Sequence, residues 1–584
     1  MKRLFYPVLL ICISILSFNC QKEISGEGGG PSLPAPSAPI TATIQGKIVD
    51  ENNLPAAGVS IKVGTKTAIT DAKGYFRITK ASLDKNASLV VAEKSGYFKA
   101  YRTFQATSGA NHVSIKLIKK VLAGTTSSAT GGDVILPNGS KISLPANGIV
   151  KAFGGSYSGT VNVYSAYIDP TAADISQTVP GSFMADDKDG KRVTLTSYGM
   201  LAVELESPAG EKLQIAIDKK ATLTAPIPSS ILASAPATIP LWYVDEQTGI
   251  WKEEGTAVKN GNNYVGDVKH FSFWNYDICV PAINLSMTLK NPDGIPLVHV
   301  QVRLKRSNGS SSYGYTDTLG RVSGLVPANE ILQMDVMNNC NASVYNQNIG
   351  PFTQNTDLGV ITITAPVSAQ LTIQGTVLNC SGNPVTNGTV VVDYDYPRYV
   401  NTNASGQFAV VIYGCGGGGP STCSITATDN TAQQQGNIVV VPITTPVTYA
   451  GNITACGTST AQFINYTLDG TPYALASPQD SMICYTVGQA NPYFTILSGN
   501  GNPSNNNIDI WTQHPTVTAG TYPLWMLQVQ NYTRIQLLTP ADISFTTFPS
   551  PGGFYEGNFS VNFKDSSDLS VSHTLNGNFR IKRY

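Results

Sequence analysis

The residues with the clearest chemical potential are three neighbours, His270, Phe271 and Ser272. A serine hydroxyl can attack the carbonyl before it when a histidine acts as base and the peptide bond is strained. Ser272 would then form an ester with Phe271, and water would open that ester. The alternative is an ordinary strand, in which Phe271 and Phe273 share one face and Trp274 lies on the other. The sequence favours the strand and leaves self-cleavage as a hypothesis.

Two further stretches contain partial ligand-binding patterns. Residues 414–419 contain G-x-G-x-x-G, but a dinucleotide fingerprint needs a following helix, and Pro420 follows here. A flexible hairpin tip closed by a disulfide is favoured. Residues 186–190 suggest a calcium loop, but Ala185 stands at the first ligand position and no closing Glu follows. A solvated turn is favoured there, so we expect no metal and no cofactor.

The cysteines predict disulfides in an exported protein. Of nine cysteines, Cys12 lies in the N-terminal apolar run and Cys20 follows it. The other seven lie in the C-terminal half: Cys279, Cys340, Cys380, Cys415, Cys423, Cys456 and Cys484. Because seven is odd, at least one thiol is free or pairs outside the chain. We expect a Cys279–Cys340 bridge and bridges among the cysteines from 380 to 456. A zinc cluster is disfavoured because no two cysteines have C-x2–4-C spacing.

The N-terminus has the layout of a secretory signal peptide. Lys2 and Arg3 precede an apolar run from Leu4 to Leu16, which is shorter than the about 20 residues that span a membrane. The run ends in LSFNC, which resembles a relaxed bacterial lipobox with Cys20 as the acylated first residue of the mature protein. Residues 21–23 (QKE) resemble a short signal for the outer face of the outer membrane.

No later apolar run approaches the length of a membrane span, so the lipid on Cys20 would hold the chain at the outer membrane. Residues 26–39 are rich in Gly, Pro, Ala and Ser and would act as a tether. We therefore expect a lipid-anchored protein of the outer membrane that is exposed at the cell surface.

The composition excludes some classes of function. The chain balances 38 Lys and Arg against 38 Asp and Glu, which argues against nucleic-acid binding because phosphates attract a basic surplus. Charged residues make up only 13%, which argues against long solvated helices. The 42% of hydrophobic residues argues against disorder over most of the chain.

Period-two alternation of apolar residues dominates the chain, for example in residues 59–63, 161–163 and 298–302. Helical periodicity is nearly absent, and a short helical turn is expected only at residues 229–235. Short strands separated by Gly, Pro and Asn predict an all-β fold of tandem β-sandwiches, Ig-like or transthyretin-like.

One turn occurs three times along the chain. Residues 70–76 (TDAKGYF), 316–322 (TDTLGRV) and 402–408 (TNASGQF) share Thr, then Asp or Asn, then Gly three positions later. This pattern fits a type I β-turn, after which an apolar residue starts the next strand. A strand, a polar turn and a proline precede each copy, the proline being Pro55, Pro296 or Pro384.

This arrangement resembles the carboxypeptidase regulatory-like domain, a transthyretin-like β-sandwich. The resemblance is best at residues 41–118, where Leu54-Pro55, Gly58-Val59 and the turn occur in the family's order. It implies a non-catalytic module that is common at bacterial surfaces. The peptidase itself would need a zinc site, and the chain has no H-E-x-x-H pattern.

Residues 122–278 differ from the three copies. Their opening (GGDVILPNG, 131–139) and closing aromatic segments (242–251 and 270–275) are similar to a ZU5-type β-sandwich. Some sandwiches of this type cut themselves between Phe and Ser of His-Phe-Ser. The resemblance therefore implies the same reaction for His270, Phe271 and Ser272, with His270 as base.

Residues 457–584 are expected to form one more β domain, of no recognised family. Trp511, Trp525, Tyr493 and Tyr522 would suit a face on which sugars stack, although aromatic residues in strands more often belong to the core. A hydrolase here would need convergent carboxylates, and this segment has few acidic residues.

The expected partition is signal peptide 1–19, lipidated cysteine and tether 20–40, regulatory-like sandwich 41–120, ZU5-like region 121–280, regulatory-like sandwiches 281–366 and 367–456, and C-terminal domain 457–584. We expect a non-enzymatic surface lipoprotein that binds a glycan, a protein or an envelope partner, besides membrane lipid through Cys20. The alternatives are a self-cleaving surface protein using His270 and Ser272, and a hydrolase in residues 457–584.

Overall fold

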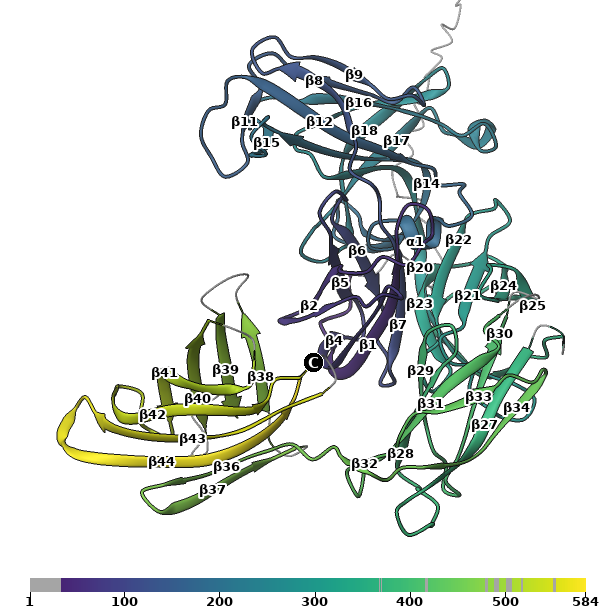
Figure 1. Cartoon of the computed structure of the whole chain (residues 1–584). Helices are drawn as coiled ribbons and strands as arrows, with labels where there is room; N and C mark the ends of the chain where they lie inside the picture. Colours follow the sequence, from purple (N-terminus) through teal and green to yellow (C-terminus); the bar gives the residue numbers. More distant parts are fainter. Residues whose placement is uncertain are drawn as a thin grey trace, which may run out of the picture.

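The computed structural model describes residues 33–366, 368, 370–414, 419–477, 480, 482–487, 493–499, 507–515, 518–549 and 553–583. The fold is all-β with tandem β-sandwiches, as the sequence predicts (Figure 1). A 3₁₀ turn, η1 (Leu232–Ser234), lies in the expected helical segment, whereas no sequence pattern indicated α1 (Ile175–Thr178). Within the described ranges no helix is long and apolar enough to cross a membrane. The signal segment and Cys20 lie outside the described residues.

The first sandwich pairs two small sheets, β4-β1-β7 and β3-β2-β5-β6. Its strands are β1 (Pro39–Val49), β2 (Ser60–Val63), β3 (Lys66–Ile69), β4 (Tyr75–Asp84), β5 (Ser88–Glu93), β6 (Ala100–Phe104) and β7 (Asn111–Lys116). β1 pairs with β4 antiparallel and with β7 parallel. Alternate side chains of both sheets, such as Ile44, Ile61 and Phe76, fill the buried space between them.

The third and fourth sandwiches repeat this topology. The third uses β20 (Phe273–Lys290), β21 (Gln301–Lys305), β22 (Ser311–Tyr315), β23 (Arg321–Pro327), β24 (Leu332–Met337), β25 (Ser343–Ile349) and β26 (Thr356–Thr362). The fourth uses β27 (Gln370–Leu378), β28 (Gly388–Asp393), β29 (Pro397–Asn401), β30 (Gln407–Tyr413), β31 (Thr422–Asp429), β32 (Gln434–Gln435), β33 (Val439–Pro442), β34 (Val447–Thr454) and β35 (Thr458–Ser459). The orders β23-β20-β26 and β30-β27-β34 again place one antiparallel and one parallel partner beside a central strand.

The repeated turn has the same hydrogen bonds in all three copies. The carboxylate or amide oxygen accepts from the backbone N–H groups two and four residues later, at 2.7–2.9 Å, in Asp71, Asp317 and Asn403. The glycine of the turn has a positive φ each time, for instance +70° at Gly74. A Cβ on Gly74 would lie 2.3 Å from the carbonyl oxygen of Ile48. Backbone conformation and space therefore both require glycine here.

The hydrogen bonds of the turn threonine, Thr70 in the first copy and Thr316 in the third sandwich, show which residues of the two copies correspond. Its Oγ1 accepts the N–H of Val59 in the first copy and of Val300 in the third sandwich, at 2.9 Å in each. This alignment places His299 at the position of Gly58, and both have positive φ, +57° and +72°. A side chain in this conformation costs about 1–3 kcal/mol, so surrounding contacts must hold His299 there.

The second unit, residues 122–280, contributes most strands of a 15-stranded sheet. Its strands are β8 (Leu122–Ser127), β9 (Gly132–Ile135), β10 (Lys141–Leu144), β11 (Ile149–Lys151), β12 (Thr160–Ile168), β13 (Met184–Asp186), β14 (Arg192–Glu206), β15 (Lys212–Ile215), β16 (Ala221–Pro226), β17 (Thr238–Val244), β18 (Trp251–Asn260), β19 (Asn263–Val268) and the first half of β20. The boundary expected at 280/281 falls inside β20, whose two halves serve the second unit and the third sandwich. A continuous strand therefore joins these two units.

The C-terminal unit is one nine-stranded sheet that curves around a single core (Figure 1). Its strands are β36 (Phe463–Leu468), β37 (Thr471–Ala476), β38 (Met482–Val487), β39 (Tyr493–Gly499), β40 (Ile508–His514), β41 (Gly520–Val529), β42 (Ile535–Thr547), β43 (Phe554–Asp565) and β44 (Asp568–Lys582). Buried side chains from both ends of the sheet, such as Ile464 and Leu497, reach the same core.

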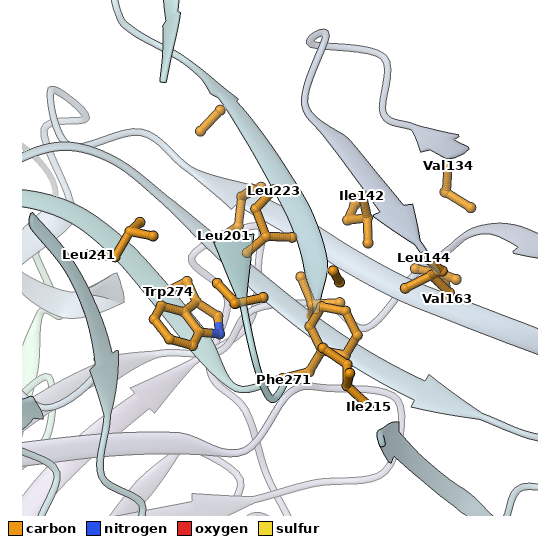
Figure 2. Close-up of a cluster of buried hydrophobic side chains, with 14 of the residues drawn as sticks. Val134, Ile142, Leu144, Val163, Leu201, Ile215, Leu223, Leu241, Phe271 and Trp274 are labelled. Carbon is orange, nitrogen blue, oxygen red and sulfur yellow. The ribbon is translucent and has the colours of Figure 1, made fainter. Parts of the chain in front are cut away.

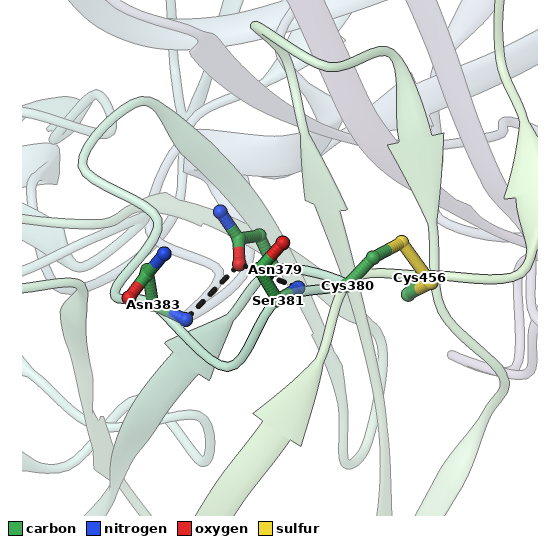
Figure 3. The surroundings of a disulfide bond; sticks show 5 residues. All are labelled: Asn379, Cys380, Ser381, Asn383 and Cys456. Atoms are coloured by element: carbon green, nitrogen blue, oxygen red, sulfur yellow. Dashed lines mark hydrogen bonds between the residues drawn. A yellow bond between two sulfur atoms is a disulfide. The ribbon is translucent and has the colours of Figure 1, made fainter.

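Cys380 and Cys456 form a disulfide in the fourth sandwich, one of the bridges expected among residues 380–456 (Figure 3). The prediction that Cys423 forms a disulfide is wrong. Cys423 is a free thiol in the core of that sandwich and is 1% exposed. The expected closure of the 414–423 hairpin through Cys423 is therefore wrong, and Cys415 lies outside the described residues. Cys279 and Cys340 are disulfide-bonded, and their mutual pairing stays a prediction.

The first, third and fourth sandwiches meet at a buried polar junction. Gln45 of β1 donates from Nε2 to Nε2 of His299 at 2.6 Å. The donor direction follows from Gln45 Oε1, which already accepts from Tyr75 Oη at 2.8 Å and Arg77 Nε at 3.2 Å. The His299 ring stacks on His112 of β7, with centroids 4.7 Å apart. These contacts hold His299 in its unusual backbone conformation.

The fourth sandwich closes the junction with aromatic and charged groups. The rings of Tyr396 and His112 are 5.7 Å apart, and the Arg398 guanidinium lies 3.8 Å above the Tyr396 ring. Arg398 also forms an ion pair with Asp395. Burial, together with the charges of Arg398 and Lys47 and against the opposing charge of Asp395, lowers the pKa of His112 to about 3. Burial, His112 and nearby arginines likewise lower the pKa of His299.

Lowering the pH from 7.5 to 5.5 should destabilise the wild-type junction more than the junction of His299→Asn. The folded pKa values lie below the value of about 6.5 for an unfolded histidine. The stability that the neutral rings provide is therefore complete above about pH 6.5 and declines toward pH 3, by up to about 1.4 kcal/mol per pH unit for each histidine. Asparagine tolerates the positive φ. Calorimetry of the full chain at both pH values measures the difference, and an equal pH dependence in both proteins would contradict the junction.

Candidate functional site

His270, Phe271 and Ser272 lie at a bend between β19 and β20 and not within a strand. The expected sharing of one face by Phe271 and Phe273 is therefore wrong. Phe271 packs with Trp274 in the main core of the second unit (Figure 2). Phe273 packs in a different core, which also includes residues of the first sandwich. The bend before β20 breaks the strand alternation and directs the two rings to opposite sides.

A glutamine side chain binds the backbone of this bend. Gln214, on β15, accepts the N–H of Phe271 at 2.7 Å and donates to the Phe271 carbonyl at 3.1 Å. The Gln214 amide thus makes the two backbone hydrogen bonds that a neighbouring strand would otherwise make with Phe271. The carbonyl that it binds is the one that Ser272 would attack. Gln214 lies 57 residues before Phe271, and no sequence signal connects the two.

The side chains of His270 and Ser272 have separate partners. Burial lowers the pKa of His270, with Glu254 opposing the shift, and the two side chains approach to 3.8 Å. The His270 ring meets Tyr243 edge-on at 4.7 Å. Ser272 Oγ donates to the Phe273 carbonyl at 3.1 Å. The site therefore contains a neutral imidazole (His270), a hydroxyl (Ser272) and an amide donor (Gln214) on the carbonyl of Phe271. For Ser272 Oγ to attack that carbonyl, its side chain must first rotate away from the carbonyl of Phe273.

The segment 186–190 is the turn between β13 and β14. Asp186 forms ion pairs with Arg192 and Lys252, while Asp187 accepts backbone N–H groups of the turn at 2.8 and 3.0 Å. Across the part of the chain that the structure describes, no group of three His, Cys, Asp or Glu side chains is placed to hold a metal. Of the glycine-rich tip, residues 415–418 lie outside the described residues.

Aromatic and aliphatic residues form a stripe across four strands of the C-terminal unit. The strand register places Tyr485 (β38) opposite Ile496 (β39), Ile496 opposite Trp511 (β40), and Trp511 opposite Met526 (β41). Directly opposed residues share a face, and the core residue Leu497 lies on the other face. The stripe therefore lies on the outer face of the sheet. We call Tyr485, Ile496, Trp511, Trp525 and Met526 the aromatic stripe.

A register shift in β41 exposes Trp525. Between the pairs Trp511↔Met526 and Thr512↔Leu524, Trp525 is the extra residue of the bulge, and 57% of its surface is exposed. Its ring centroid lies 5.9 Å from that of Trp511 at an interplanar angle of 45°. Tyr485 is 42% exposed at the opposite end of the stripe. The sequence indicated the tryptophan pair but not Tyr485, because register alone brings Tyr485 into line.

Two other predicted members of this face have different outcomes. Tyr522 packs against the core of the unit, with its ring 4.9 Å from His514, as the sequence favours for aromatic residues in strands. The side chain of Tyr493 lies outside the described residues. A polar row runs beside the stripe, formed in register by Ser498, Asp509 and Gln528.

Four carboxylates of the C-terminal unit have partners within the unit. Asp469 lies 2.7 Å from the His573 ring, and Glu556 accepts from Arg580 at 2.6 Å. Asp565 and Asp568 bind the serines of their own hairpin turn. These partners orient the carboxylates toward surface ion pairs and turn hydrogen bonds.

The chain matches no family model. It is similar to cartilage intermediate layer protein 2 of Homo sapiens, with 28% identity over 123 residues, which are 20% of this chain and 10% of that protein. It is also similar to the Mus musculus protein of the same name, with 23% identity over 235 residues, which are 38% of this chain and 20% of that protein. These matches span no more than a fifth of the relatives' length.

Similar solved structures include GBS52, the minor pilin of Streptococcus agalactiae, at 8% identity and a TM-score of 0.13, covering 30% of this chain and 97% of that chain. The Bacillus anthracis TIE protein has 11% identity and a TM-score of 0.14, covering 79% of this chain and 70% of that chain. At these TM-scores the likenesses support no argument about function.

Proposed function

We propose that this protein is a surface lipoprotein that binds a glycan on the aromatic stripe of its C-terminal unit. The observation that carries the proposal is the stripe itself, in which strand register aligns Tyr485 with Trp511 on the outer face of a sheet and a bulge places Trp525 beside Trp511. Large apolar side chains gathered on the surface of a soluble domain mark a binding site more often than chance exposure. Tyrosine and tryptophan are also the residues that contribute most to binding energy at interfaces.

A glycan fits the chemistry of this face better than a charged partner. Sugar rings present C–H groups that stack on aromatic faces. Trp511 and Trp525 offer two such rings, whose centroids are 5.9 Å apart. The neighbouring row of Ser498, Asp509 and Gln528 offers hydroxyl, carboxylate and amide groups to sugar hydroxyls. A site of aromatic faces with a few polar groups beside them is typical of small-molecule recognition.

The remaining units would hold the stripe away from the membrane. Lipid on Cys20 would anchor the chain at the outer membrane, and residues 21–40 would serve as the tether. The four units that follow contact one another through β20 and the buried junction. In this proposal they form the support from which the C-terminal unit extends. In this proposal the protein performs no reaction on its ligand.

Self-cleavage is the second candidate, and the Gln214 contact favours it. The Gln214 amide donates to the Phe271 carbonyl at 3.1 Å, which is where a developing oxyanion needs a donor. His270 has a lowered pKa and is neutral at physiological pH, as a base must be. Ser272 supplies the hydroxyl one residue after the acceptor carbonyl.

Trp525→Ala and Trp511→Ala should each reduce glycan binding at least about 10-fold, because each removes a stacking face of a type that contributes about 2 kcal/mol or more at hot spots. A glycan array with the full chain identifies the ligand, and titration of that ligand measures the loss. Tyr449→Ala is the matched control, since Tyr449 is 74% exposed but belongs to the fourth sandwich. Equal binding by the Trp525 variant and the wild type would overturn the assignment.

Mature protein should show two bands on a denaturing gel if the bend cleaves itself, with the break between Phe271 and Ser272. Ser272→Ala should then leave one full-length band. Gln214→Leu should slow cleavage roughly 100-fold, because it removes a donor to the oxyanion. A single full-length band from the wild type after prolonged incubation rules the reaction out.

Metabolic labelling with an alkyne-bearing fatty acid in a Gram-negative host should mark the wild-type chain and not Cys20→Ser. The reason is that Cys20 would be the only acylated residue of the mature protein. Cys12→Ser is the matched control and should label like the wild type. Labelling of the Cys20 variant at the wild-type level would refute the anchor.

A further inference from the structure

An internal cavity of about 120 Å³ lies where the first sandwich, the second unit and the third sandwich meet. Its walls come from β6 and β7, from the segment between Ser176 and Thr194, and from β20, β21, β22 and β23. Each residue that lines it is buried or half-buried. The space therefore belongs to the interior of the packed units and is formed only when all three are assembled.

One wall of the cavity is the apolar interior of the third sandwich. The side chains that line it there include core residues of both sheets: Leu285, Met287, Val302, Leu304, Val322 and Val326. Phe183 and Met184 of the second unit extend this apolar wall. Such a lining favours an aliphatic group over water.

Arg102 supplies a charge to this apolar space from a core-facing position. On β6 it shares a face with Ala100 and Phe104, which pack against the core of the first sandwich. Its strand partner is Val90, which is fully buried. The nitrogens Nε and Nη2 of Arg102 are buried and have no hydrogen-bond partner. An arginine thus stands where the strand pattern calls for an apolar residue.

The cavity offers no counter-ion for Arg102. None of its lining residues is Asp or Glu. Burial lowers the pKa of Arg102 to about 10, so the guanidinium is still cationic at neutral pH. His112, which also lines the cavity, has a buried Nδ1 without a partner. A buried cation without a counter-ion is strongly unfavourable, and a bound anion removes that cost.

We propose that the cavity binds a small aliphatic carboxylate, whose carboxylate pairs with Arg102 and whose chain lies against the third sandwich. The guanidinium can hold a carboxylate through two parallel hydrogen bonds. The volume is somewhat less than that of the apolar cavity of about 150 Å³ that accommodates benzene, so a carboxylate of about the same number of heavy atoms, such as butanoate, fits best. This site is separate from the aromatic stripe and does not depend on glycan binding.

Calorimetric titration of the full chain with butanoate and with butan-1-ol tests the proposal. We expect the wild type to bind butanoate at least about 10-fold more tightly than butan-1-ol, since hydrogen bonds to charged groups are stronger than those between neutral groups. Arg102→Leu should lose this preference. It should also fold, because it replaces an unpaired buried charge with an apolar side chain of the type that the position suits.

A second variant tests the cavity volume independently of the charge of Arg102. Val326→Phe keeps Arg102 but fills part of the cavity, so it should weaken the binding of butanoate and of butan-1-ol alike. Inorganic phosphate, which has no apolar chain, should not compete with butanoate at equal concentration. Each of three results would overturn the proposal: no butanoate binding by the wild type, unchanged butanoate binding by Arg102→Leu, or full competition by phosphate.

Discussion

A buried hydrogen bond joins two sandwiches, from Gln45 of the first to His299 of the third, and part-buried hydrogen bonds such as Gln105–Asn284 and Thr107–Asp317 join the same two sandwiches. His299 has a positive φ at a position where the first sandwich has Gly58, so the third sandwich accepts local backbone strain there. The compensation comes from Gln45, from the stacked ring of His112 and from Tyr396 of the fourth sandwich. Loss of the neutral ring would leave the buried Nε2 of Gln45 without its acceptor.

The contacts between the first and third sandwiches also bear on the position of the second unit. Because β20 runs from the second unit into the third sandwich, fixing the third sandwich on the first also fixes the second unit. Contacts such as the ion pair Lys116–Asp174 then join the first sandwich to the second unit. The cavity around Arg102 exists only in this arrangement, since each of the three units supplies a wall.

The sequence predicts what local chemistry decides. The all-β class, the three copies and their turns follow from alternation and from Asp, Asn and Gly at fixed spacing, and the structure confirms identical turn hydrogen bonds at Asp71, Asp317 and Asn403. Alternation would also have indicated the buried thiol of Cys423, because Cys423, Ile425 and Ala427 share the inward face of β31. The predicted disulfide of Cys423 overlooked that pattern.

The sequence does not show contacts that only the tertiary arrangement creates. Gln214 reaches Phe271 across 57 residues, and Gln45 reaches His299 across 254. Arg102 interrupts an apolar strand face, and the cavity that it lines has walls from two other units. Tyr485 joins Trp511 through register across β39. These residues have ordinary local surroundings in the sequence, so no pattern there distinguishes them.

The central claim is that the contact between Gln45 and His299 couples two sandwiches. A double-mutant cycle with Gln45→Leu, His299→Asn and the double variant, measured as the free energy of unfolding of the full chain at pH 7.5, tests it most directly. The account predicts a coupling energy of about 1 kcal/mol or more, as for residues in one hydrogen-bond network. Additive effects within about 0.3 kcal/mol would contradict it.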